Sequence, residues 1–110
     1  MFAESAPAVE VSAVPSEAYL LDVREQDEWT AGHAPRAVHM PLHELRQRAG
    51  EVPSDRQVYV VCRSGGRSAQ AVQALNEAGW QAVNVSGGMQ AWNVAGYDMV
   101  SESGSEPRVI

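Results

Sequence analysis

The residues best suited to chemistry in this chain are one cysteine and the six that follow it. Cys62 is the only cysteine among 110 residues, and two Gly, two Ser and two Arg fill the next six positions. Small residues let the backbone curl tightly and turn its N–H groups inward, which makes a cradle for an anion. Arg63 and Arg67 add permanent positive charge, and such surroundings lower the pKa of a thiol. Because the thiolate is the nucleophile, this segment predicts a reactive sulfur beside an anion-binding site.

The alternative is that Cys62 is a small apolar residue at the end of a buried strand, as many free cysteines are. That interpretation does not explain why two Gly, two Ser and two Arg follow the cysteine directly. We therefore favour a functional thiol.

The spacing between Cys62 and Arg67 limits which anion the loop can hold. A phosphate-binding cysteine loop has five residues between its Cys and its Arg, and here it would require Arg at position 68, which is Ser. The shorter ring suits a terminal persulfide sulfur or a sulfonate-like anion better than a phosphate. A cysteine phosphatase or an arsenate reductase is therefore the less favoured hypothesis.

Short apolar runs alternate with amphipathic segments, and this order positions the cysteine. Strands are expected at residues 9–11, 19–23, 37–40, 58–61 and 82–85. Helices are expected at 25–31, at 42–49, from about Ser68 to Gly79, and at 89–95. This alternation predicts a mostly parallel α/β sheet. Ligands of such sheets bind beyond the carboxyl ends of the strands, which is where Cys62 stands.

Composition excludes several classes of function. Eight Arg, no Lys and 14 acidic residues give a net charge of −6, which argues against nucleic-acid and anionic-membrane partners. The absence of Lys excludes a lysine nucleophile. A lone cysteine excludes an intrachain disulfide and fits a reducing compartment, so we expect a cytoplasmic protein. We expect one domain at 9–99, with flexible ends at 1–8 and 100–110.

Four segments, in this order and spacing, resemble the single-domain rhodanese-like sulfurtransferases. They are Leu-Leu-Asp-Val-Arg at 20–24, Glu-Trp-Thr-Ala-Gly-His-Ala-Pro at 28–35, the cysteine loop at 62–67 and Gly-Gly-Met-Gln-Ala-Trp at 87–92. The resemblance covers about residues 19–97.

The resemblance implies a five-stranded, mostly parallel sheet flanked by helices, and sulfur transfer through a persulfide on Cys62. The donor would be a small anion such as thiosulfate, bound by Arg67 or Arg63, and the acceptor a small thiol or a protein. Backbone amides of 63–67 would stabilise the persulfide, and no metal or organic cofactor is implied. The expected substrate-binding residues are Arg63, Ser64, Gly65, Gly66, Arg67 and Ser68. The same fold could instead serve as a non-catalytic binding or sensing module.

Three polar residues near the predicted site are expected to have structural roles. Asp22 and Arg24 stand at a strand end, where the carboxylate can tie down loop amides or pair with an arginine. His33 is expected to brace a helix end, and it is the best general-base candidate if one exists.

Other polar residues are expected to stay outside the chemistry. His39 and His43 have the spacing of a zinc-binding helix, but Pro41 between them breaks any helix, so no metal site is expected. Arg36 stands where the family mostly has Gly, and we expect it in solvent. Asn84 begins a chance glycosylation sequon inside a predicted buried strand.

Overall fold

Five short strands pair into one parallel sheet in the computed structural model, which describes residues 6–110. The sheet order is β1-β5-β4-β2-β3, and every neighbouring pair is parallel. This confirms the predicted five-stranded α/β fold. The strands are β1 (Ala8–Val9), β2 (Tyr19–Asp22), β3 (Val38–His39), β4 (Gln57–Val61) and β5 (Gln81–Val85).

The β-branched run of β4 forms the middle of the sheet. Val58, Val60 and Val61 have no exposed surface, because β2 and β5 flank the strand and helices cover both of its faces. Side chains alternate across a strand, so neighbouring residues enter different cores. Val60 packs in the core beneath α3 (Gly66–Glu77), and Val61 packs in the core beneath α4 (Gly88–Val94).

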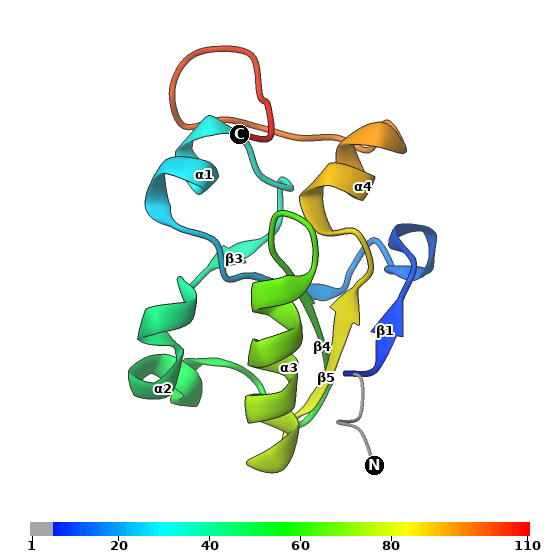
Figure 1. Cartoon of the computed structure of the whole chain (residues 1–110), viewed down its shortest axis with the longest axis vertical. Helices are drawn as coiled ribbons and strands as arrows, with labels where there is room; N and C mark the ends of the chain where they lie inside the picture. Colours follow the sequence, from blue (N-terminus) through cyan, green and yellow to red (C-terminus); the bar gives the residue numbers. More distant parts are fainter. Residues whose placement is uncertain (1–5) are drawn as a thin grey trace.

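Figure 1 shows the helices arranged around this sheet. The segment predicted as one helix over 42–49 consists of a 3-10 turn (Leu42–Glu44), the short α2 (Leu45–Arg48) and a second 3-10 turn (Ala49–Glu51). The helix expected from about Ser68 begins two residues earlier, at Gly66. The remaining helices are α1 (Gln26–Ala31) and the 3-10 turn Val11–Ala13. Over the described residues, none of the helices has the length and apolar character needed to cross a membrane.

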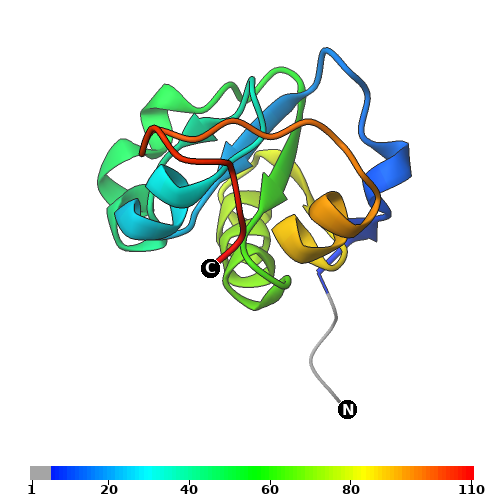
Figure 2. The same cartoon turned by 90° about the horizontal axis from the view of Figure 1, so that it is seen from above.

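The C-terminal segment, residues 98–110, leaves α4 and returns across α1 (Figures 1 and 2). Val100 and His33 exchange two backbone hydrogen bonds of 2.9 Å, and the Arg108 N–H donates to the Ala31 carbonyl at 3.0 Å. Met99 and Val109 pack against the core beneath α4. The flexibility expected for 100–110 stays a prediction, although the structure gives this segment defined contacts. The flexible end expected at 1–8 lies mostly outside the described residues.

A substitution at Gly32 can test whether residues 98–110 pack tightly against the end of α1. A Cβ there would lie 2.5 Å from the Arg108 carbonyl oxygen and 2.7 Å from the Arg108 nitrogen, while the extended backbone at Gly32 suits any residue. We expect Gly32→Ala to displace the segment and lower the free energy of unfolding by about 1–3 kcal/mol in urea titrations.

Gly50→Ala is the matched control, because a Cβ at Gly50 meets no atom within 4 Å. Equal stability of the two variants would contradict the packing described for 98–110.

Candidate active site

The carboxyl ends of β2, β4 and β5 lie at one edge of the sheet, and the cysteine loop lies among them (Figure 1). Cys62 directly follows β4, and α3 begins four residues later. The turn between them needs glycine, because Gly65 has a φ of +120°, a conformation that side chains rarely allow.

The Cys62 sulfur is buried, and hydrogen-bond donors converge on it. The residue is 1% exposed, the Gly65 N–H donates to Sγ at 3.1 Å, and the Ser68 hydroxyl lies 3.2 Å from it. Sequence reasoning placed both residues in the site, and the structure brings both to the sulfur.

Two opposing effects set the pKa of Cys62. Burial is the larger single effect and raises the pKa, because a charged sulfur loses contact with water. Hydrogen bonds from the Ser68 hydroxyl and from the N–H groups of Ser68, Gly65 and Ser64 favour the thiolate. Together they outweigh burial, so the pKa of Cys62 lies below its ordinary value. The loop therefore activates the thiol mainly through hydrogen bonds.

Asn84 on β5 fixes the group that contacts the sulfur. Its Nδ2 donates to the Gly65 carbonyl at 3.1 Å, which turns Oδ1 toward the Ser68 hydroxyl at 2.6 Å. A hydroxyl has one proton to donate, so Ser68 can direct it either to Asn84 or to the Cys62 sulfur. Sequence reasoning missed this residue, and the available signal was a buried polar side chain inside an apolar strand.

The start of α4 holds the loop from the other side. The N–H groups of Met89 and Gln90 donate to the carbonyls of Cys62 and Arg63 at 2.8 and 3.0 Å. Gly88 has a φ of +57°, and a Cβ there would overlap the Cys62 carbonyl oxygen and lie 2.7 Å from the Arg63 carbonyl carbon. This close approach explains the second glycine of the segment at 87–92.

Asp22 and Arg24 form a fully buried ion pair beneath the site. Arg24 Nε lies 2.9 Å from Asp22 Oδ1, and Nη2 lies 2.8 Å from Oδ2. The same Nη2 donates to the Gly32 carbonyl at 2.7 Å, so the pair connects the end of β2 to the end of α1. Neither residue has a hydrogen bond to Cys62 among the described contacts, and both brace the fold near the loop.

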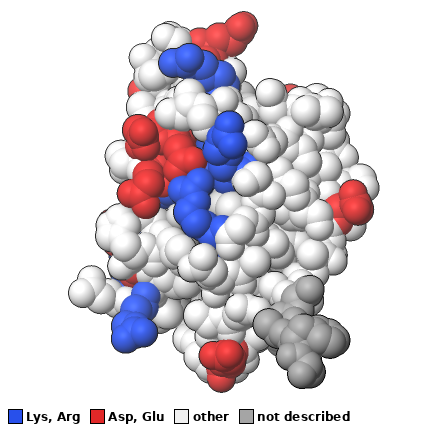
Figure 3. Space-filling model, viewed as in Figure 1, with Lys and Arg blue, Asp and Glu red and all other residues white. Residues whose placement is uncertain are grey.

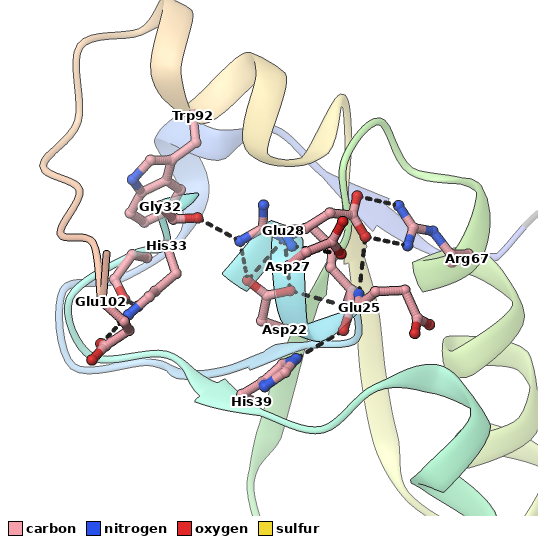
Figure 4. A network of polar contacts seen from close by, with 12 residues as sticks. Asp22, Glu25, Asp27, Glu28, Gly32, His33, His39, Arg67, Trp92 and Glu102 are labelled. Atoms are coloured by element: carbon pink, nitrogen blue, oxygen red, sulfur yellow. Dashed lines mark hydrogen bonds and ion pairs between the residues drawn. The ribbon is translucent and has the colours of Figure 1, made fainter. Parts of the chain in front are cut away.

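The Arg67 guanidinium is already paired. Its two terminal nitrogens donate to the two Glu28 carboxylate oxygens at 2.7 and 2.8 Å (Figure 4). These hydrogen bonds hold the pKa of Glu28 below its usual range, against the effect of burial. Sequence reasoning missed the role of Glu28, because Glu28 lies 39 residues before Arg67 and no motif spacing connects the two. The other arginine, Arg63, donates from Nε to the Ile110 main-chain oxygen at 2.9 Å.

His33 and His39 have partners other than the Cys62 sulfur. His33 Nε2 is 2.8 Å from Glu102 Oε2, Nδ1 is 2.8 Å from the Ala34 oxygen, and its ring stacks on Trp29. His39 Nε2 lies 2.8 Å from the Arg24 oxygen. Within residues 6–110, no three His, Cys, Asp or Glu side chains gather as metal ligands.

We predict that Ser68→Ala raises the pKa of Cys62, because it removes the hydroxyl that favours the thiolate while burial remains. The measurement is the rate of Cys62 alkylation by iodoacetamide across pH, with the midpoint expected to move upward. Ser64→Ala is the control, because Ser64 contributes its backbone N–H, which the variant keeps. Equal midpoints in the wild type and Ser68→Ala would show that the hydroxyl does not lower the pKa of Cys62.

Known proteins are similar to this chain over a range that includes β2 to β5 and the cysteine loop. A family model described as the rhodanese-like domain matches residues 9–95. A sulfurtransferase of Allochromatium vinosum is 38% identical over 86 residues, which cover 77% of this chain and 80% of that protein. The Bacillus subtilis protein YtwF is 41% identical over 76 residues, which cover 69% of this chain and 74% of that protein.

Among solved structures, a rhodanese-related protein of Thermoplasma volcanium superposes with a TM-score of 0.81 at 32% identity. The match covers 86% of this chain and 97% of that one. The chain therefore belongs to the rhodanese-like domain family and is homologous to sulfurtransferases.

Proposed function

We propose that this protein is a sulfurtransferase that carries sulfane sulfur as a persulfide on Cys62. The observation that carries the proposal is the buried sulfur surrounded by hydrogen-bond donors in a short loop. These donors favour a negative sulfur at this position, and the outer sulfur of a persulfide carries such a charge.

The reaction has two displacement steps. The Cys62 thiolate attacks the outer sulfur of a donor such as thiosulfate, the donor's S–S bond breaks, and sulfite leaves with the electron pair. An acceptor thiolate then attacks the outer sulfur of the Cys62 persulfide and regenerates the Cys62 thiolate. No change in the oxidation state of the protein remains after a full cycle.

Loop residues 63–68 supply the groups that each step needs. The N–H groups of Ser64, Gly65 and Ser68 favour the negative sulfur, and the Ser68 hydroxyl can turn toward it. Arg67 and Arg63 are the cations available to an anionic donor. The face of Arg67 that pairs with Glu28 would have to exchange that carboxylate for the donor, whereas Arg63 is bonded to the Ile110 main-chain oxygen through Nε.

The acceptor must come from outside the chain. Cys62 is the only cysteine of these 110 residues, so they contain no second thiol to which the persulfide sulfur could move. We propose a small thiol or a protein thiol as acceptor, and a reducing compartment such as the cytoplasm, where the lone thiol stays reduced.

We expect the wild-type protein, incubated with thiosulfate and then freed of small molecules, to gain the mass of one sulfur atom. Cys62→Ser should gain none, because a serine hydroxyl is a far weaker nucleophile than a thiolate. Intact-mass spectrometry measures both, and addition of a thiol should return the wild type to its starting mass.

Equal sulfur gain by Cys62→Ser would contradict the proposal. A wild-type chain that takes no sulfur from thiosulfate or from any persulfide donor would favour the non-catalytic binding module. Cys62-dependent hydrolysis of an aryl phosphate would favour the phosphatase hypothesis.

A further inference from the structure

Arg67 is a cation of the cysteine loop, and a carboxylate already pairs with it. The charge of Cys62 acts on Arg67, while both terminal nitrogens of Arg67 donate to Glu28. In such a bidentate pair, the two terminal nitrogens of the guanidinium both donate to the same carboxylate, and this is the geometry in which arginine binds anions best. An anionic donor must therefore either displace Glu28 from this face of Arg67 or bind the N–H groups that remain, beside the Glu28 carboxylate.

Glu28 is held in place by the start of its own helix. Its Oε1 accepts the Glu25 N–H at 2.9 Å, and the Glu25 side chain caps the Glu28 N–H in return. The Glu28 side chain is 12% exposed. The Glu28 carboxylate is therefore held in a defined position. Rotating the side chain into solvent would break both its ion pair with Arg67 and its hydrogen bond to the Glu25 N–H.

The pairing changes the charge that a donor meets. Arg67 and Glu28 carry opposite charges, so the pair offers an anionic donor little net positive charge. Figure 3 shows acidic side chains directly beside arginines on this face of the molecule. Figure 4 shows that Glu25 and Asp27 lie next to Glu28, at the start of α1. A divalent anion such as thiosulfate meets repulsion from each of these carboxylates.

We propose that Glu28 is a specificity-determining residue that competes with anionic donors for Arg67 and so selects donors with less negative charge. This inference rests on the proposed sulfur transfer and names its donor class: persulfides of thiols that carry a nearby cationic group. Such a donor gives its outer sulfur to Cys62 when its S–S bond breaks and the donor thiolate leaves. It needs the backbone N–H groups of the loop and does not need Arg67 to be free.

The test compares two donors on the full chain: thiosulfate, and the persulfide of cysteamine, whose ammonium group offsets its negative charge. Glu28→Gln removes the charge but keeps a side chain that can complete the helix cap. We expect this variant to load Cys62 from thiosulfate with a KM about tenfold lower, the scale of one unit charge at a partly screened site. Loading from cysteamine persulfide should change by less than about twofold, because that donor gains little from a free Arg67.

Two control variants separate charge from position. Glu28→Asp keeps the negative charge on a shorter side chain, and it should leave the KM for thiosulfate well above that of Glu28→Gln. Asp27→Asn removes a neighbouring charge that has no described contact with Arg67, and it should lower that KM by much less than Glu28→Gln does.

The inference is wrong if Glu28→Gln leaves the ratio of the two donors unchanged while the wild type still loads sulfur from both. It is also wrong if Glu28→Asp or Asp27→Asn lowers the thiosulfate KM as much as Glu28→Gln does. Sulfur loading by none of the proteins from either donor would overturn the proposed function itself, and the inference with it.

Discussion

A buried sulfur atom needs hydrogen-bond donors before it can carry a negative charge. The cysteine loop and the elements packed around it provide and position these donors. Cys62 directly follows the central strand β4 and is 1% exposed, so burial alone would favour the protonated thiol. Only a loop that turns several N–H groups toward the sulfur reverses that effect. The loop is too short to do so unaided, because Gly65 must adopt a positive φ and the carbonyls that point outward must find partners elsewhere. The N–H groups at the start of α4 supply two of those partners.

Strands β5 and β2 and helix α1 hold the loop in the conformation that places these donors around the sulfur. From β5, Asn84 orients the Ser68 hydroxyl and holds the Gly65 carbonyl. Below the loop, the Asp22–Arg24 pair connects the end of β2 to the end of α1, and α1 carries Glu28 to Arg67. Loss of one partner of such a buried pair leaves an uncompensated charge, which costs far more than the pair contributes. The site is therefore held by contacts among elements that are distant in sequence.

Local patterns predict the parts of this arrangement that depend on neighbouring residues. The β-branched run at 58–61 and the glycines after Cys62 fix the strand, the turn and the place of the thiol. Contacts across the fold could not be predicted in the same way. In the sequence, Glu28 is an acidic residue at the start of a helix, as many helices have. Only the folded chain brings it to Arg67. The prediction that Arg67 or Arg63 binds the donor therefore did not include the pairing of Arg67 with Glu28. Residues 42–49 were expected to form one helix, and the chain forms a 3-10 turn, the short α2 and a second 3-10 turn there.

Hydrogen bonds, rather than the two arginines, favour the thiolate of Cys62. An ultraviolet absorbance titration of the wild-type protein tests it directly, because the only cysteine gives the only thiolate signal. Long-range attraction to arginines is screened by salt, whereas short hydrogen bonds in a buried loop are screened far less. We expect a titration midpoint below the ordinary thiol value of about 8.5, and nearly the same midpoint at low and at high ionic strength. A midpoint at or above the ordinary value, or one that rises steeply with salt, would contradict it.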